Sequence, residues 1–80
     1  MQEFEAIACC DDKSFGRFES YHENAYFSTL SEAQEWVLET LERWYWNGFA
    51  SVCGNIYFDS QEVGSYDMQD VELRIKARDR

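Results

Sequence analysis

The stretch TLSEAQEWVLETLERWYWNG, residues 29–48, predicts an amphipathic helix from about Leu30 to Trp46. Thr29 and Glu32 have the T-x-x-E spacing of a capping box, in which side chains satisfy free backbone N–H groups of the first turn. Gly48 suits the left-handed conformation that commonly follows a helix. Apolar residues recur at helical spacing on one side, at Ala33, Trp36, Val37, Leu41 and Trp44.

Working outward from this helix, alternating apolar and polar residues predict strands on both sides of it. The expected strands cover residues 3–10, 17–22, 49–58 and 71–78, with a turn at Asp11–Ser14 and a polar loop at Asp59–Asp70. One amphipathic helix covers one face of one sheet. The sequence therefore predicts a single α+β domain over residues 1–80, with the order β-β-α-β-β. In this domain the helix packs on one face of a four-stranded antiparallel sheet.

Charge narrows the classes of partner. The 80 residues carry sixteen acids and seven bases, for a net charge of −9. Residues 1–72 alone carry −12 and the last eight residues carry +3. Nucleic acids and anionic membranes repel such a chain, so we expect a partner with a basic surface. The bases of the last strand are expected to pair with acids on neighbouring strands, such as Glu3, Glu5 or Glu19.

The expected helix carries a glutamate row opposite its apolar side, and this row is the main candidate binding surface. We expect the row and the aromatic end of the helix to contact a basic protein. Acids of the loop at residues 59–70 extend this surface. The alternatives are a solvated helix face and an aromatic lid on the core. The candidate protein-binding residues are Glu32, Glu35, Glu39, Glu42, Tyr45, Trp46, Asp59, Glu62 and Asp67.

Catalytic and metal sites have little support in the sequence. The single histidine, His22, has no nearby nucleophile or acid that indicates a catalytic relay. Cys9, Cys10 and Cys53 could join His22 as zinc ligands, but their spacing is unlike that of a zinc knuckle. Residues 59–70 match an EF-hand loop at only some positions. We therefore expect no enzyme activity, no metal and no cofactor.

The cysteine count and the N-terminus indicate a compartment. Three cysteines are an odd number, which argues against a complete disulfide framework. The sequence starts without the basic and apolar regions of a signal peptide, and no apolar run is long enough to cross a bilayer. The expectation is a cytoplasmic protein with reduced thiols.

In length, acidity and its capped, glutamate-rich helix, the chain resembles the small acidic inhibitors that phages make against host defence, namely anti-CRISPR proteins and other DNA mimics. The resemblance implies binding to a nuclease or CRISPR complex in the host cytoplasm, where the chain occupies a basic, nucleic-acid-binding surface. The alternative hypothesis is a self-associating scaffold subunit, in which an edge strand or the Trp46 region forms a homodimer.

Overall fold

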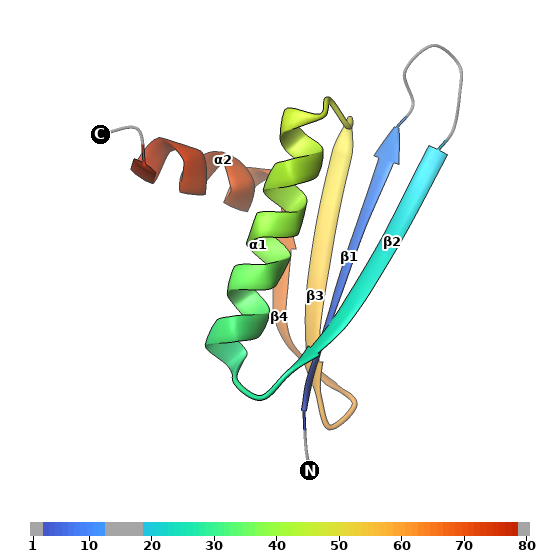
Figure 1. Cartoon of the computed structure of the whole chain (residues 1–80), viewed down its shortest axis with the longest axis vertical. Helices are drawn as coiled ribbons and strands as arrows, with labels where there is room; N and C mark the ends of the chain where they lie inside the picture. The colour runs from blue at the N-terminus through green and yellow to red at the C-terminus, as the bar shows by residue number, and fades with distance from the viewer. Residues whose placement is uncertain (1–2, 13–18, 79–80) are drawn as a thin grey trace.

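The central helix forms where the sequence predicts it. The computed structural model describes residues 3–12 and 19–78, and its helix α1 spans Leu30–Trp46 (Figure 1). The hydroxyl of Thr29 accepts the N–H of Glu32 at 3.2 Å and donates to the Glu32 carboxylate at 2.9 Å. The Thr29 half of the capping box is therefore confirmed, whereas the Glu32 carboxylate contacts the hydroxyl of Thr29 and not its backbone N–H. Gly48 follows the helix with a φ of 89°.

The four strands form one antiparallel sheet in the order β2-β1-β3-β4. The first hairpin is confirmed, but its strands are longer than predicted and β1 continues through Asp11 and Asp12. The remainder of the expected turn, Lys13 and Ser14, lies outside the described residues. The strands are β1 (Phe4–Asp12), β2 (Glu19–Phe27), β3 (Ser51–Phe58) and β4 (Gln61–Asp67).

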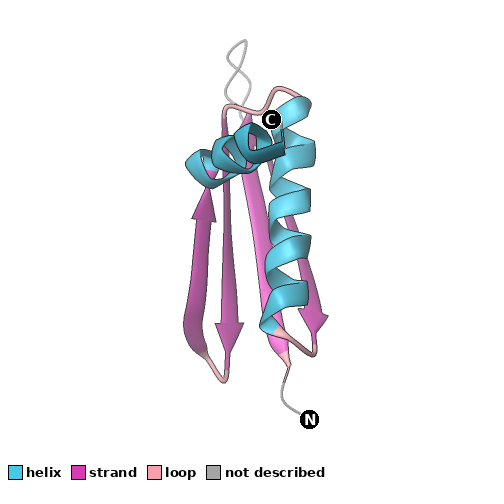
Figure 2. Cartoon of the chain, turned by 90° about the vertical axis from the view of Figure 1, so that its left-hand side faces the viewer, coloured by secondary structure: helices cyan, strands magenta, loops and turns pink. Residues whose placement is uncertain are grey.

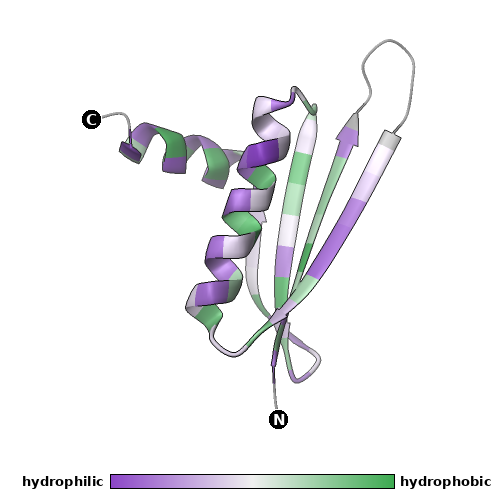
Figure 3. Cartoon of the chain, in the orientation of Figure 1, coloured by the Kyte–Doolittle hydropathy of each residue, from purple (hydrophilic) through white to green (hydrophobic). Residues whose placement is uncertain are grey.

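The core lies between α1 and one face of the two central strands. On the strands the buried residues are Ala6, Ala8 and Cys10 of β1, and Val52, Gly54 and Ile56 of β3. On α1 they are Ala33, Val37, Thr40, Leu41 and Trp44. Central strand β3 carries hydrophobic bands, whereas edge strand β2 is largely hydrophilic (Figure 3). Helix and sheet approach closely at Gly54, where an added Cβ would meet Cγ1 of Val37 at 2.5 Å.

The prediction for the C-terminal third was wrong in detail. The fourth strand is β4, which lies within the segment predicted as a loop, and residues 71–78 belong to a second helix, α2 (Met68–Arg78). The β3–β4 connection is a two-residue turn in which Asp59 and Ser60 both have positive φ, at 54° and 64°. Such turns match the twist of paired strands. The α+β class and the four-stranded antiparallel sheet are confirmed, with two helices instead of one.

Helix α2 has a physical basis in its own residues. Asp67 accepts the backbone N–H groups of Gln69 and Asp70, and the Asp70 carboxylate accepts the N–H of Asp67. Together these bonds cap the helix start. Val71 is fully buried and Ile75, one turn later, packs against the core. Figure 2 shows α2 lying crosswise to α1.

The cysteines also differ from expectation. Cys9 and Cys53 are direct partners in the β1–β3 ladder and form a disulfide, with their Cα atoms 5.4 Å apart. The prediction of reduced thiols is therefore wrong for these two residues. Cys10 points to the opposite face and is buried in the core, as strand alternation requires. Among the described residues, neither helix is long and apolar enough to cross a membrane.

Candidate binding surfaces

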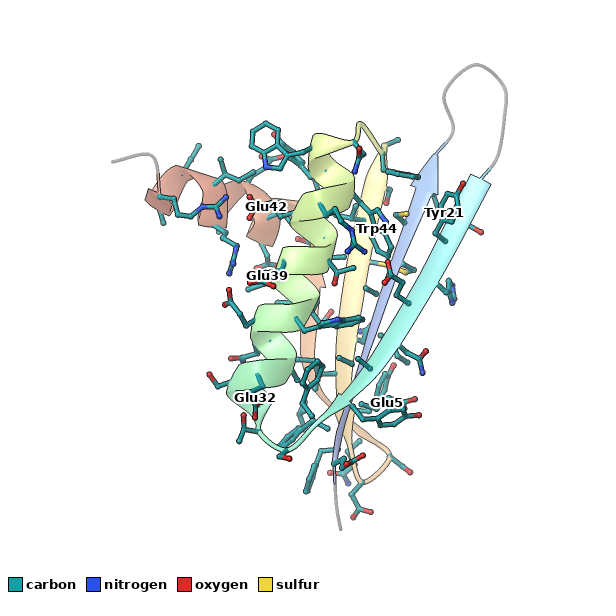
Figure 4. All side chains as sticks on the ribbon, in the orientation of Figure 1. Glu5, Tyr21, Glu32, Glu39, Glu42 and Trp44 are labelled. Atoms are coloured by element: carbon teal, nitrogen blue, oxygen red, sulfur yellow. A yellow bond between two sulfur atoms is a disulfide. The ribbon has the colours of Figure 1, made fainter. Side chains whose placement is uncertain are left out.

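The glutamate row on α1 is partly neutralised by α2. Arg74 donates to both carboxylate oxygens of Glu35, at 2.6 and 3.2 Å, and its Nε donates to Glu42 at 3.2 Å. Arg78 donates to the other oxygen of Glu42. The expected pairing of these bases with acids on strands was wrong, because α2 turns them toward α1. Figure 4 shows Glu32, Glu39 and Glu42 along α1.

These contacts keep both paired glutamates ionised. A hydrogen bond from Arg74 lowers the pKa of Glu35. Lost hydration acts to raise the pKa of Glu42, but hydrogen bonds from Arg78, Trp46 and Arg74 outweigh it, so the pKa is lowered overall. The Glu42 side chain is only 13% exposed. The two glutamates therefore belong to an internal ion-pair network that joins α1 to α2.

The remaining predicted residues of α1 differ in availability. Glu39 is exposed, and Glu32 is exposed but engaged by the capping hydroxyl. Trp46 is 65% exposed, and its indole N–H donates to Glu42 at 3.1 Å. The ring of Tyr45 meets the Trp46 ring edge-on at 5.2 Å. α1 thus presents Glu39 and the Trp46 ring to solvent, but not a continuous row of unpaired carboxylates.

A second acidic surface lies on the opposite face of the sheet. Both helices lie on one side of the sheet in Figure 1, and no described element covers the other side, which we call the open face. The β1 residues that point to it are Glu5, Ile7, Cys9 and Asp11, since their neighbours along the strand are buried. The registers align them with His22, Asn24 and Tyr26 on β2, and with Cys53, Asn55 and Tyr57 on β3.

Of the three acids predicted in the loop, Glu62 and Asp59 belong to this surface and Asp67 lies at its edge. Glu62 of β4 faces Tyr57 and accepts a hydrogen bond from the amide of Asn55. Asp59 stands in the exposed β3–β4 turn. Asp67 is the register partner of Cys53, but its carboxylate caps α2. The predicted binding residues therefore divide between α1 and the open face.

The open face is hollowed at the end of the sheet where β1 begins. The concavity has a volume of about 460 Å³. The Tyr26 hydroxyl donates to the Glu5 carboxylate at 3.1 Å, and this bond and the glutamate charge raise the pKa of Tyr26. Its walls combine acidic, aromatic, aliphatic and hydroxyl side chains, and none of the lining residues is basic. They are Glu3, Glu5, Ile7, Tyr26, Tyr57, Asp59 and Ser60.

Described cations are confined to the helices. Arg43 is on α1, and Arg74, Lys76 and Arg78 are on α2. Arg43 pairs with Glu23 on the helix side of β2. The described part of the open face therefore carries carboxylates and no lysine or arginine, and its only ionisable base is His22.

No family model, curated protein or solved structure matches the chain. The described residues contain no group of three or more His, Cys, Asp or Glu side chains placed to hold a metal ion.

The predicted binding residues do not include Glu5, Tyr26 or Tyr57, which line the concavity. Alternation along the strands places Ile7 beside acids on one face of β1, and Tyr57 on the polar face of β3. The missing information was the register, which brings Glu5 opposite both Tyr26 and Tyr57. Alternation along a strand determines the face of a residue but not its neighbours across the sheet.

Proposed function

We propose that the chain is a protein-binding inhibitor whose open face docks onto a basic, nucleic-acid-binding surface of another protein. The observation that carries this proposal is the distribution of the bases. The described open face carries carboxylates but no lysine or arginine, whereas every described lysine and arginine lies on the helices, where acids are also present. Such a face complements a phosphate-binding surface, and the attraction speeds encounter and weakens as salt rises. The resemblance noted above makes a host defence nuclease or CRISPR complex the partner to test first.

The open face suits this role better than the α1 row. Docking through Glu35 or Glu42 would compete with Arg74, which already binds both carboxylates. Glu62, by contrast, accepts from the neutral amide of Asn55 and pairs with none of the described lysines and arginines, so it keeps its charge available. Glu5 is held by a tyrosine hydroxyl, which also leaves its charge uncompensated.

The test is a binding screen against purified nucleases and CRISPR effector complexes, followed by displacement of labelled DNA from any protein that binds. The open-face variant is Glu5→Lys with Glu62→Lys, and the matched control on α1 is Glu32→Lys with Glu39→Lys. Both variants make the same change in net charge. We expect the wild type and the control to displace DNA, less well at high salt, and the open-face variant to fail.

Two results would overturn the proposal. One is the absence of binding to any member of the panel. The other is a reversed pattern, in which the α1 variant loses activity and the open-face variant keeps it.

A second candidate function is self-association through β2. Among the strands that the structure describes, β2 pairs with β1 alone, and it carries Tyr21 and Tyr26, which are 47% and 57% exposed. An edge of this kind can pair with a second copy of itself. Light scattering across a concentration series tests this, and a monomer at the highest concentration would exclude it.

A further inference from the structure

The concavity on the open face has a construction that suits one type of side chain. It combines two tyrosines, an isoleucine and three carboxylates, and its remaining lining residue is a serine. A charged row on a flat surface attracts any cation in the same way. A hollow with aromatic walls and a held carboxylate also selects by shape.

The arrangement of the walls follows from two strand ladders. Glu5 is the direct partner of Tyr26 on β2 and of Tyr57 on β3. Because neighbouring strands lie about 4.8 Å apart, the two tyrosines stand roughly 10 Å apart with Glu5 between them. The Tyr26 hydroxyl donates to one oxygen of Glu5 at 3.1 Å, which leaves a second lone pair on that oxygen and both lone pairs of the other oxygen to accept from a ligand. Figure 4 places Glu5 on the side of the sheet away from α1.

The chemistry of the walls excludes most ligands. Glu3, Glu5 and Asp59 repel an anion, and a purely apolar group would leave the half-buried Glu5 carboxylate without a counter-charge. A cation with an apolar stem meets both requirements, because aromatic faces attract cations and Ile7 supports the stem. Among cations, a planar guanidinium stacks on an aromatic ring and donates two parallel hydrogen bonds to a carboxylate.

We propose that this concavity binds an arginine side chain of the partner, with its guanidinium against Glu5 and beside the rings of Tyr26 and Tyr57. This inference rests on the proposed function, since it names the group on the basic partner that the open face recognises. The arginine enters as the central contact of the interface, and Glu3 and Asp59 form the acidic rim.

Backbone-amide NMR titration tests the pocket without the partner. The probes are three capped peptides, Gly-Gly-X-Gly-Gly, in which X is arginine, lysine or neutral citrulline. We expect the arginine peptide to shift the amides of Glu5, Tyr26 and Tyr57 saturably, and citrulline to leave them unchanged. Glu5→Gln should weaken binding by at least about tenfold, and Tyr57→Leu by about two- to fivefold. The control Glu39→Gln, on α1, should leave it unchanged.

Several outcomes would overturn the arginine pocket. The first is that the citrulline peptide binds as well as the arginine peptide. The second is that the amide shifts spread over α1 and that Glu39→Gln weakens binding as much as Glu5→Gln does. The amide spectrum reports the fold of each variant. If Tyr57→Leu unfolds, Asp59→Asn in the exposed turn takes its place and should weaken arginine binding.

The two proposals can fail separately. If the arginine peptide binds at Glu5 but docking of the open face displaces DNA from no partner, the proposed function is wrong and the pocket stands. If the open face displaces DNA from a partner, but Tyr57→Leu does not weaken peptide binding and the citrulline peptide binds like the arginine peptide, the pocket is wrong and the docking function stands.

Discussion

Removing the disulfide should lower the stability of the fold by a large fraction of its total. The change is Cys9→Ser with Cys53→Ser, which keeps the size of both side chains close to the original. The bridge joins residues 44 positions apart, across a segment that holds β2 and α1. In the chain-entropy model, a loop of this length restricts the unfolded chain by about 4 kcal/mol at 25 °C. Domains of this size are commonly stable by only about 4–12 kcal/mol.

Urea unfolding followed by tryptophan fluorescence measures this loss. With a urea dependence of ~1–2 kcal/mol per molar, the midpoint should fall by roughly 2–4 M. A reducing agent should lower the wild-type midpoint similarly and leave the double variant unchanged. Cys10→Ala is the control, because it changes a cysteine without touching the bridge and should remain sensitive to reduction.

A thiol count gives an independent check. Of the three cysteines, one should react in the unfolded, non-reduced protein, because the other two are joined. Three reactive thiols, or a wild-type midpoint that does not respond to reduction, would refute the reasoning.

Three further changes test the packing, the helix contact and the turn. Gly54→Ala should destabilise the fold by about 1–3 kcal/mol, because the new methyl collides with Val37. In the same urea assay, adding Val37→Ala should recover part of the loss. Unchanged stability of Gly54→Ala would contradict the close approach of helix and sheet. Arg74→Gln should cost about 1 kcal/mol at pH 7. Because the partner Glu35 has a lowered pKa, this contribution is present above about pH 4.5 and should disappear as the pH falls further; a difference from wild type that persists at low pH would count against it. Ser60→Gly should stabilise the fold by about 0.5–1 kcal/mol, since glycine accepts the positive φ of 64° without strain. Thermal unfolding of this variant checks the prediction, with Ser60→Ala as the control that keeps the strain.

The sequence was sufficient where local chemistry and burial agree. The capping residue Thr29, the apolar spacing and Gly48 define α1 at both ends, because each feature acts within one or two helical turns. The inward faces of β1 and β3 also follow from alternation with period two. These parts needed no information about distant residues.

The segment VELRIKAR, residues 71–78, was misread because two periods fit it equally. Val71, Leu73 and Ile75 alternate as in a strand, but Val71 and Ile75 are also one helical turn apart. Tertiary contacts decide between them, since the helix buries Val71, leaves Leu73 61% exposed and directs Arg74 at α1. Likewise, Asp59–Ser60 lacks the glycine that usually marks a tight hairpin, so β4 gave no local signal.

The candidate site was only half accessible to sequence reasoning. Acidity and the need for a basic partner follow from composition. The division between a paired row on α1 and an open face whose described part lacks lysine and arginine does not follow from composition, because it depends on Arg74 and Arg78 crossing from α2 to α1.

The central place of the first strand has a consequence for synthesis. β1 is synthesised before the other described strands, but its inner neighbour β3 begins about forty residues later. At a synthesis rate of about 5–20 residues per second, β1 waits roughly 2–8 s for that partner. During this interval the β1–β2 hairpin and α1 are the elements available, and an isolated hairpin is marginally stable at best. The nascent chain therefore completes its core only after β3 emerges, and any fragment that ends before Ser51 leaves β1 without one of its two neighbours.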